Sequence, residues 1–190
     1  MRKILIPFFV LLSLSLNAQK VINIQPLGDI SVDVINVVIS SVENFYGYKC
    51  IVKPKINFTK DILADSKTRY NASKILSKFN SHQNLLIITN KDIACEKGNI
   101  NEWGIFGLGY RPGVTCVVST FRIKRNVSQE VFYQRLKKIC LHEIGHNLGL
   151  NHCNSGDHRC MMNDANGTII KVDGEQIFFC KNCWKLLGKN

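Results

Sequence analysis

The spacing of apolar residues along the first half of the chain predicts alternating strands and helices. Residues 21–27 form a short apolar run that is typical of a strand. From residue 30 to 46 the apolar positions recur at helical spacing, and Gly47 is expected to end that helix. Residues 51–56 alternate as a strand does, and residues 71–79 have a short amphipathic helical pattern.

The second half continues the alternation. The unbroken apolar run 85–89 suits a central strand that is covered on both faces. Residues 103–109 and 114–121 are expected to be two further strands joined by a turn that contains Pro and Gly. A longer helix is expected over residues 128–149, with Ser128 as its N-cap. This order favours an α/β fold built on a mixed, largely parallel sheet.

The first eighteen residues have the pattern of a secretory signal peptide. Basic residues follow Met1, an uncharged apolar run covers residues 4–16, and Ala18 is a small residue before the expected cut. The run is shorter than the ~20 apolar residues that cross a bilayer. We therefore expect one domain at residues 19–190, no membrane span after cleavage, and a secreted or periplasmic location.

The net positive charge of the chain does not alter the expected fold or location. The formal net charge is +11, and loss of Arg2 and Lys3 with the signal peptide leaves +9. The basic residues are scattered and are not interleaved with aromatic residues, as a nucleic-acid groove would require. We expect a solvated basic surface and no nucleic-acid partner; binding of acidic polymers is a weaker alternative.

A metal-binding pattern lies at the end of the long predicted helix. His142 and His146 are four residues apart, so both rings project from one face. Glu143 lies beside the first histidine, and Gly149 allows a left-handed backbone that reverses the chain and returns His152 to the same ion. Three neutral imidazoles leave zinc one open position, as a catalytic site needs. A water molecule there has a pKa of about 7, and Glu143 is placed to take its proton.

A group of four cysteines follows the histidine pattern at once. Its members are Cys153, Cys160, Cys180 and Cys183. They can hold a second, tetrahedral zinc, or they can form two disulfides, which a secretory route favours. We prefer zinc because a CxxC disulfide closes a small strained ring that is more typical of redox sites. The remaining cysteines are disulfide partners or buried thiols that the sequence cannot pair, namely Cys50, Cys95, Cys116 and Cys140.

The residue order through both groups resembles the archaemetzincin signature, HExxHxxGxxHC-x4-C-x-M-x17-CxxC. The matching segments are residues 142–153, 160–162 and 180–183, and the resemblance extends upstream through 85–91, 103–110 and 117–122. The chain departs from the signature between Cys153 and Cys160, where it has six residues in place of four. Asp157 and His158 lie in this interval, and either side chain could perturb the cysteine site. The simpler interpretation of His158 is a solvent-exposed loop residue.

The resemblance implies a single metzincin-like domain of the α/β (α+β) class. It implies a mixed, mostly parallel twisted sheet, an active-site helix and a short C-terminal zinc-bound segment. By resemblance, the site residues are the catalytic zinc ligands His142, His146 and His152, the general base Glu143, the structural zinc ligands Cys153, Cys160, Cys180 and Cys183, and the Met-turn residue Met162.

The function expected from the sequence is that of a zinc-dependent metallopeptidase. It would hydrolyse peptide bonds in a peptide or protein substrate by Glu143-assisted attack of a zinc-bound water, as a monomer with two zinc ions. The resemblance suggests aminopeptidase-like or otherwise restricted cleavage. The main alternative is a secreted binding module that zinc stabilises and that has no turnover.

Overall fold

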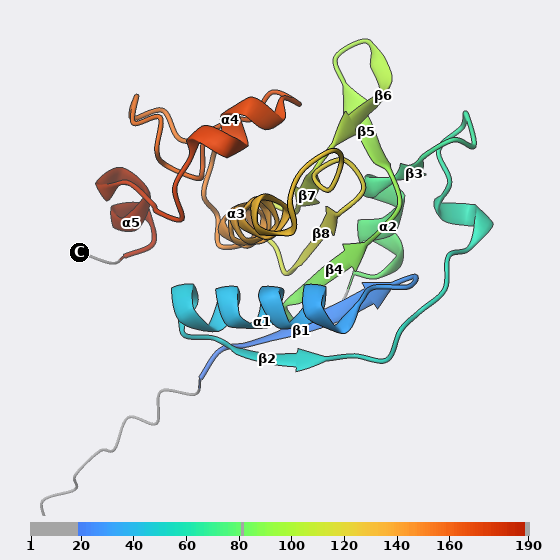
Figure 1. Ribbon diagram of the computed structural model, residues 1–190, viewed down its shortest axis with the longest axis horizontal. Helices are drawn as coiled ribbons and strands as arrows, with labels where there is room; N and C mark the ends of the chain where they lie inside the picture. Colours follow the sequence, from blue (N-terminus) through green and yellow to red (C-terminus); the bar gives the residue numbers. More distant parts are fainter. Residues whose placement is uncertain (1–18, 81, 189–190) are drawn as a thin grey trace, which may run out of the picture.

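The computed structural model describes residues 19–80 and 82–188, so the predicted signal peptide lies outside the described residues. A five-stranded sheet in the order β2-β1-β4-β8-β7 forms the centre of the molecule (Figure 1). Its strands are β1 (Val21–Leu27), β2 (Lys49–Val52), β4 (Leu85–Thr89), β7 (Gly107–Gly109) and β8 (Thr115–Ser119). All neighbouring pairs are parallel except β7 with β8. The expected mixed, largely parallel sheet is therefore confirmed.

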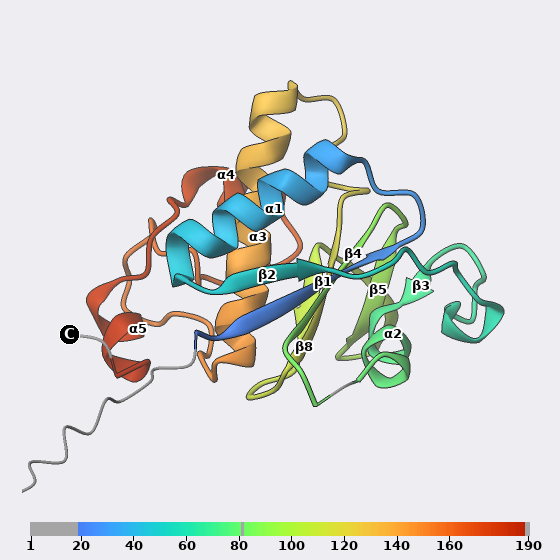
Figure 2. The ribbon, with the colours of Figure 1, turned by 90° about the horizontal axis from the view of Figure 1, so that it is seen from below.

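Helices cover both faces of this sheet. Alternate residues of a strand point to opposite faces, so one strand contributes to both layers of the core. Helices α1 (Val32–Tyr46) and α3 (Gln129–Asn147) share one face with Leu86 and Ile88 of β4. Helix α2 (Ala72–Lys78) packs on the other face against Ile87 of the same strand. The run 85–89 is thus the central, doubly covered strand that its composition predicts. Figure 2 shows α1 crossing over α3 on their common side.

One strand expectation is wrong. The segment 103–109 is divided between two sheets: β6 (Ile100–Ile105) pairs with β5 (Ile93–Lys97), whereas β7 pairs with β8. The chain changes partners at Phe106, between the two strands. Together with β3 (Tyr70–Asn71), β5 and β6 form a small second sheet whose hairpin projects from the body of the molecule (Figure 1).

Helix termini follow their local chemistry. Ser31 and Ser128 accept hydrogen bonds from the backbone N–H groups of Val34 and Val131, so both are N-caps. Gly47 ends α1 at a φ of 71°. Helix α3 ends at Asn147, two residues before the predicted end at Gly149. Strand β2 likewise begins and ends earlier than the predicted strand 51–56, of which Ile56 makes only an isolated bridge to Leu27.

The C-terminal segment folds over the end of the helical layer. It contains the short helices α4 (Ile169–Gly174) and α5 (Lys181–Leu186). A 3-10 turn (Lys60–Ile62) lies elsewhere, between β2 and β3. Phe179 and Trp184 pack on Phe45 of α1, with ring centroids 5.1 and 5.5 Å away. Arg135 of α3 holds α4 through a bidentate pair with Asp173 at 2.7 and 2.6 Å. None of the described helices is long and apolar enough to cross a membrane.

Candidate metal centre and active-site cleft

The structure brings the three predicted histidine ligands together. His142 and His146 lie one turn apart on α3, with ring centroids separated by 4.5 Å. After the helix, Gly149 adopts a φ of 98° and the chain turns back. The His152 ring then lies 4.9 Å from His146 and 5.4 Å from His142. Each ring offers a nitrogen to a group of ligand atoms that all lie within 4.8 Å of one another.

Backbone carbonyl groups select the ring nitrogen that is available to a metal. His142 Nδ1 lies 2.6 Å from the carbonyl oxygen of Met161, and His146 Nδ1 lies 2.7 Å from that of Leu150. A carbonyl oxygen only accepts, so each Nδ1 carries the proton and each Nε2 keeps its lone pair. His152 has a carboxylate partner instead, since its Nδ1 lies 3.8 Å from Asp164 Oδ2.

Burial also keeps these rings in the neutral form that binds metal. It lowers the pKa of His142 to about 3 and that of His146 to about 4. Burial lowers the pKa of His152 as well, although its side chain is 44% exposed. Three neutral imidazoles that converge on one point are a fitting donor set for zinc, with a fourth position left to solvent or substrate.

Glu143 is held in the same cleft by a strand that approaches α3 closely. A Cβ added to Gly107 would lie 2.6 Å from Glu143 Oε1, and one added to Gly109 would lie 2.8 Å from the Glu143 carbonyl oxygen. A larger residue at Gly107 would displace the Glu143 side chain, and one at Gly109 would collide with the helix backbone. The carboxyl group is buried, and this burial raises its pKa to about 8. A nearby cation would favour the ionised form instead.

Met162, the predicted Met-turn residue, packs against the active-site helix next to His146. A Cβ on Gly145, the residue before His146, would lie only 2.6 Å from Met162 Sδ. Met162 is fully buried. The neighbouring Met161 is the residue whose carbonyl oxygen orients His142, so the two methionines have different places in the site.

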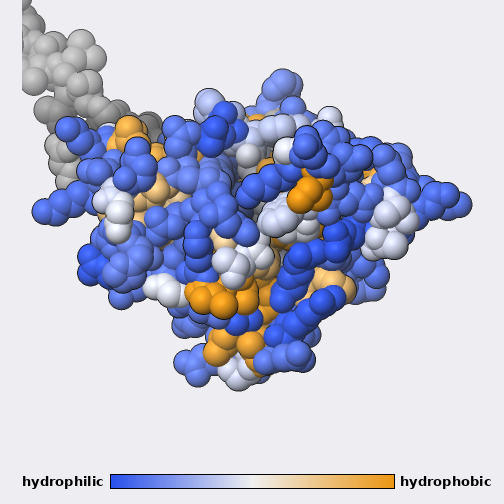
Figure 3. Space-filling view, turned by 90° about the horizontal axis from the view of Figure 1, so that it is seen from above, coloured by the Kyte–Doolittle hydropathy of each residue, from blue (hydrophilic) through white to orange (hydrophobic). Residues whose placement is uncertain are grey.

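The histidines and Glu143 line a cleft of about 480 Å³. Strand β7 and the β5–β6 hairpin form one wall, and the loop from Asn163 to α4 forms the other. Figure 3 shows the molecule from the side on which α4 and the β5–β6 hairpin lie in Figure 1, with hydrophobic patches set among mostly hydrophilic residues. The walls approach each other closely here. Lys97 Nζ lies 3.4 Å from the side-chain amide of Asn166, and a Cβ on Gly167 would lie only 2.9 Å from the Trp103 ring.

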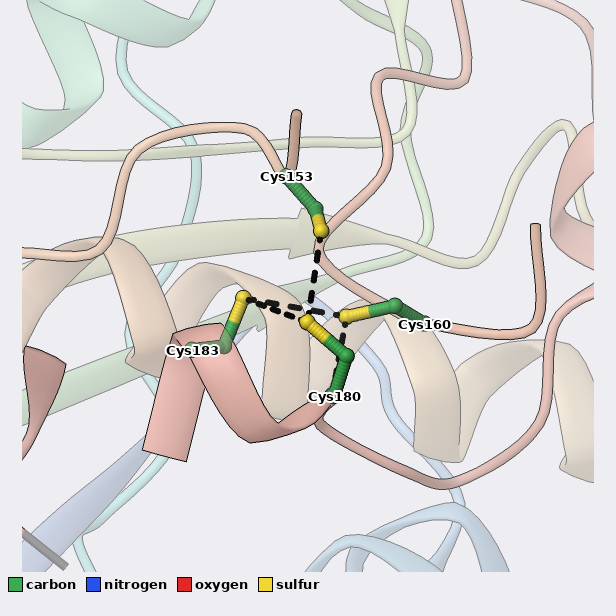
Figure 4. Close-up of side chains that lie close together, drawn as sticks. All are labelled: Cys153, Cys160, Cys180 and Cys183. Atoms are coloured by element: carbon green, nitrogen blue, oxygen red, sulfur yellow. Dashed lines mark hydrogen bonds between the residues drawn. The ribbon is translucent and has the colours of Figure 1, made fainter. Parts of the chain in front are cut away.

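The four motif cysteines converge at a second place (Figure 4). The Cys153 and Cys180 sulfurs are 3.5 Å apart, Cys160 and Cys183 are 3.8 Å apart, and Cys180 and Cys183 are 3.7 Å apart. These distances are close to the ~3.8 Å edge of a tetrahedron with Zn–S bonds of about 2.3 Å. The described residues form no disulfide, and all eight cysteines are free thiols. The geometry therefore fits one tetrahedral ion.

Local hydrogen bonds favour negative charge on one of these sulfurs. Burial raises the pKa of Cys180, but hydrogen bonds from Ser155 and from the backbone of Cys183 outweigh this effect and lower it to about 6. Burial raises the pKa of Cys160 to about 11. Deprotonation of all four thiols would accordingly need a bound cation.

The six-residue interval before Cys160 does not separate the sulfurs. Asp157 faces Arg159, at 3.0 and 2.9 Å, rather than the cysteines, and His158 is exposed to solvent. The loop contacts the cysteine site through Ser155, whose hydroxyl oxygen lies 3.0 Å from Cys153 Sγ. Among the other cysteines, Cys116 and Cys140 are buried, whereas Cys50 and Cys95 are half-buried.

Several residues in the cleft were not predicted as site residues, and Asp164, Lys138 and Glu175 are among them. Asp164 contacts His152, while Lys138 and Glu175 are buried on the α4 side of His142. The spacing of Lys138, four residues before His142, is a signal that could have placed it on the same helix face. The positions of Asp164 and Glu175 in the cleft depend on the path of the C-terminal segment. That segment has no regular apolar spacing from which its path could be predicted.

The assembled groups are those of a hydrolytic zinc site with a buried carboxylate and an open cleft. The model of peptidase family M54 matches residues 52–189 of the chain. Archaemetzincin from Archaeoglobus fulgidus is 30% identical, with 85% of this chain and 95% of that protein covered. Archaemetzincin from Halobacterium salinarum is 29% identical, with 85% and 96% covered.

Solved structures show the same architecture. The crystal structure of Archaeoglobus fulgidus archaemetzincin complexed with malonate superposes with a TM-score of 0.76 at 29% identity, covering 87% of this chain and 99% of that one. The archaemetzincin structure from Methanopyrus kandleri superposes with a TM-score of 0.74 at 23% identity, covering 92% and 97%. The second likeness concerns the fold alone.

Gly145→Ala should destabilise the domain because the new Cβ would collide with Met162. Forcing an extra methyl group into a packed interior costs about 1–3 kcal/mol. Urea unfolding of the zinc-loaded protein measures this loss. Gly174→Ala is the control, since nothing lies within 4 Å of a Cβ at that position. Equal stability of the two variants would contradict the close contact between α3 and Met162.

Proposed function

The chain belongs to peptidase family M54 and is a zinc metallopeptidase, and from this premise we propose that Glu143 is the general base for peptide-bond hydrolysis. Zinc held in this cleft would supply a Lewis acid that polarises the scissile carbonyl and makes a water molecule acidic. The single observation that carries the proposal is the position of the buried Glu143 carboxyl group, in the same cleft as three converging imidazoles.

The role proposed for Glu143 is proton transfer. Its carboxylate oxygen accepts the proton of the attacking water and then delivers it to the nitrogen of the leaving amine. Gly107 supports this role because its missing Cβ leaves room for the carboxylate between β7 and α3. Burial alone favours the protonated form of Glu143, and a cation held by the histidines would restore the ionised carboxylate that a base needs.

We propose that His142, His146 and His152 hold this zinc. The carbonyl groups that accept from His142 and His146 fix the direction of two rings. Asp164 would play the corresponding part for His152, and its carboxylate is itself held by the backbone N–H of Asn166 at 2.7 Å. Met162 provides the apolar floor beneath the ligands.

The substrate is proposed to bind as an extended peptide along β7. This strand is at the edge of the five-stranded sheet, and all three of its residues line the cleft. An exposed strand edge binds a peptide through main-chain hydrogen bonds, which do not depend on the peptide's sequence. Preference for particular substrates must then come from side chains elsewhere in the cleft.

We propose a second, structural zinc at Cys153, Cys160, Cys180 and Cys183. The sulfur spacing fits a tetrahedral ion, as described above. A tetrathiolate site has no open position and stabilises the fold. Here it would join α5 to the loop that carries His152.

We further propose that the protein acts outside the cytoplasm as a monomer. The support for export is the signal-like pattern of residues 1–18 in the sequence. A structural ion that is already bound on export would keep the four thiols from oxidation.

Glu143→Gln should abolish turnover while the protein keeps its metal. The amide has nearly the same shape but cannot accept the proton, so kcat/KM should fall by about 10²–10⁴-fold. Cleavage of a mixed peptide library, followed by mass spectrometry, measures the loss, and elemental analysis measures zinc. Glu130→Gln, an exposed carboxylate on the same helix, is the matched control. Peptide cleavage at the wild-type rate by the Glu143 variant would rule out the mechanism.

Elemental analysis of the purified protein should give about two zinc ions per chain, one for each proposed site. Replacing Cys180 and Cys183 together with Ser should reduce the value to about one and lower the melting temperature. A wild-type value near one, combined with no motif thiol that reacts with a thiol reagent, would favour disulfides instead.

Expression with the complete N-terminus in a bacterial host tests export. The mature chain should begin at Gln19 and be found outside the cytoplasm, as N-terminal sequencing of cell fractions would reveal. Replacing Leu11 and Leu12 with Arg should block export, because charge disrupts the apolar region. Cytoplasmic wild-type protein that still begins at Met1 would argue against the proposal.

A further inference from the structure

Glu175 carries a buried carboxyl group that the proposed mechanism does not use. The residue is 7% exposed, and among the described residues its Oε1 has no hydrogen-bond partner. It lines the same cleft as the histidines. Leaving a buried polar atom unpaired costs free energy, and the cost is larger for a charged group. Burial accordingly raises the pKa of Glu175 to about 8.

The neighbouring cation does not satisfy this carboxyl group. Lys138 Nζ donates to the carbonyl oxygens of Val172 and Asp173, at 2.8 and 3.3 Å, and so binds the C-terminal end of α4. It forms no ion pair with Glu175 among the described contacts, although its charge lowers the Glu175 pKa somewhat. Lys138 therefore supports α4 and does not supply the donor that Glu175 Oε1 lacks.

Charged and apolar side chains of α3 and α4 line the cleft together with Glu175. Lys138 lies four residues before His142 on α3, about 6 Å along the helix axis. Ile139 and Val172 line the cleft beside it and provide apolar surface. An aliphatic stem that ends in a cationic donor would match this combination of apolar walls and a carboxyl group.

Apart from Glu143, which the proposed mechanism uses, the other acidic side chains in the cleft are already engaged or exposed. Asp164 contacts His152 and accepts from Asn166, and Glu96 is open to solvent. On the opposite wall, Lys97 Nζ lies over the Trp103 ring, 5.2 Å from its centroid. Glu175 is thus the buried group in this cleft that most needs a donor.

We propose that Glu175 forms the base of a substrate subsite that binds a lysine or arginine side chain, one helical turn from His142. This inference rests on the proposed function, since it names the substrate class of that cleft. The cationic group would donate to the carboxylate while its aliphatic stem packs on Ile139 and Val172. A neutral side chain of the same shape would bind much more weakly, because it could not form this desolvated, charge-assisted hydrogen bond and would leave the carboxyl group unpaired.

Matched peptides test the preference. One series carries Arg or citrulline, and a second carries Lys or norleucine, immediately before or immediately after the scissile bond. Wild-type zinc-loaded enzyme should cleave the charged member with kcat/KM about tenfold higher or more at one of these positions. Glu175→Gln should reduce that ratio to near one. Glu96→Gln removes an exposed negative charge from the same cleft and should leave the ratio unchanged.

A binding measurement separates this inference from catalysis. Zinc-loaded Glu143→Gln protein should bind the Arg peptide about tenfold more tightly than the citrulline peptide by calorimetry, and adding Glu175→Gln should remove the difference. The melting temperature of Glu175→Gln should equal or exceed that of wild type, because the change removes an unpaired buried carboxyl group. A purely structural role would instead lower it.

The outcomes distinguish the two proposals. If no peptide is cleaved but the binding difference is found, the proposed mechanism fails and the subsite stands. If peptides are cleaved with no advantage for Arg or Lys, or if the advantage persists in Glu175→Gln, the subsite proposal is overturned. A preference for acidic side chains that is lost in Lys138→Met would also overturn it, because Lys138 would then be the recognising group.

Discussion

The hydrogen bond from His142 Nδ1 to the Met161 carbonyl oxygen is the contact on which much of the site depends. It joins the active-site helix to a segment 19 residues further along the chain, at 2.6 Å. The contact fixes the tautomer of His142 and places Met162 directly beneath the helix. The segment can approach so closely only because Gly145 has no side chain at the crossing point. Ligand orientation and core packing are therefore set by the same crossing.

The two metal-binding groups are linked through this segment. His152 and Cys153 are neighbours in the chain, and the Cys153 N–H donates to the Met162 carbonyl oxygen at 2.7 Å. Cys160 lies immediately before Met161, whose own N–H donates to Phe178, near the second cysteine pair. A displacement of the cysteine cluster would therefore move both the His142 acceptor and His152. The cysteines form a group of their own, but Cys153 directly follows His152 and Cys160 directly precedes Met161, whose carbonyl oxygen orients His142.

The sequence predicts the parts of the molecule that have regular spacing. The covered strand 85–89, the Ser128 cap, the left-handed turn at Gly149 and the convergence of His142, His146 and His152 follow from periodicity and capping chemistry. The fold class and the family are also correct. The break at Phe106 could not be foreseen, because residues on both sides of it have strand composition and only tertiary pairing divides them between sheets.

The residues that shape the cleft are those that the sequence predicts least. Helix α4 is six residues long and has no side-chain cap, so its position depends on Arg135 and Lys138 of α3. Those contacts place the chain after α4 against the helix and thereby bury Glu175 without a partner. A buried carboxyl group without a partner lowers the stability of the fold. No local pattern in the sequence predicts that Glu175 is buried. Such a conflict between burial and pairing is expected at sites where binding, rather than folding, satisfies the group.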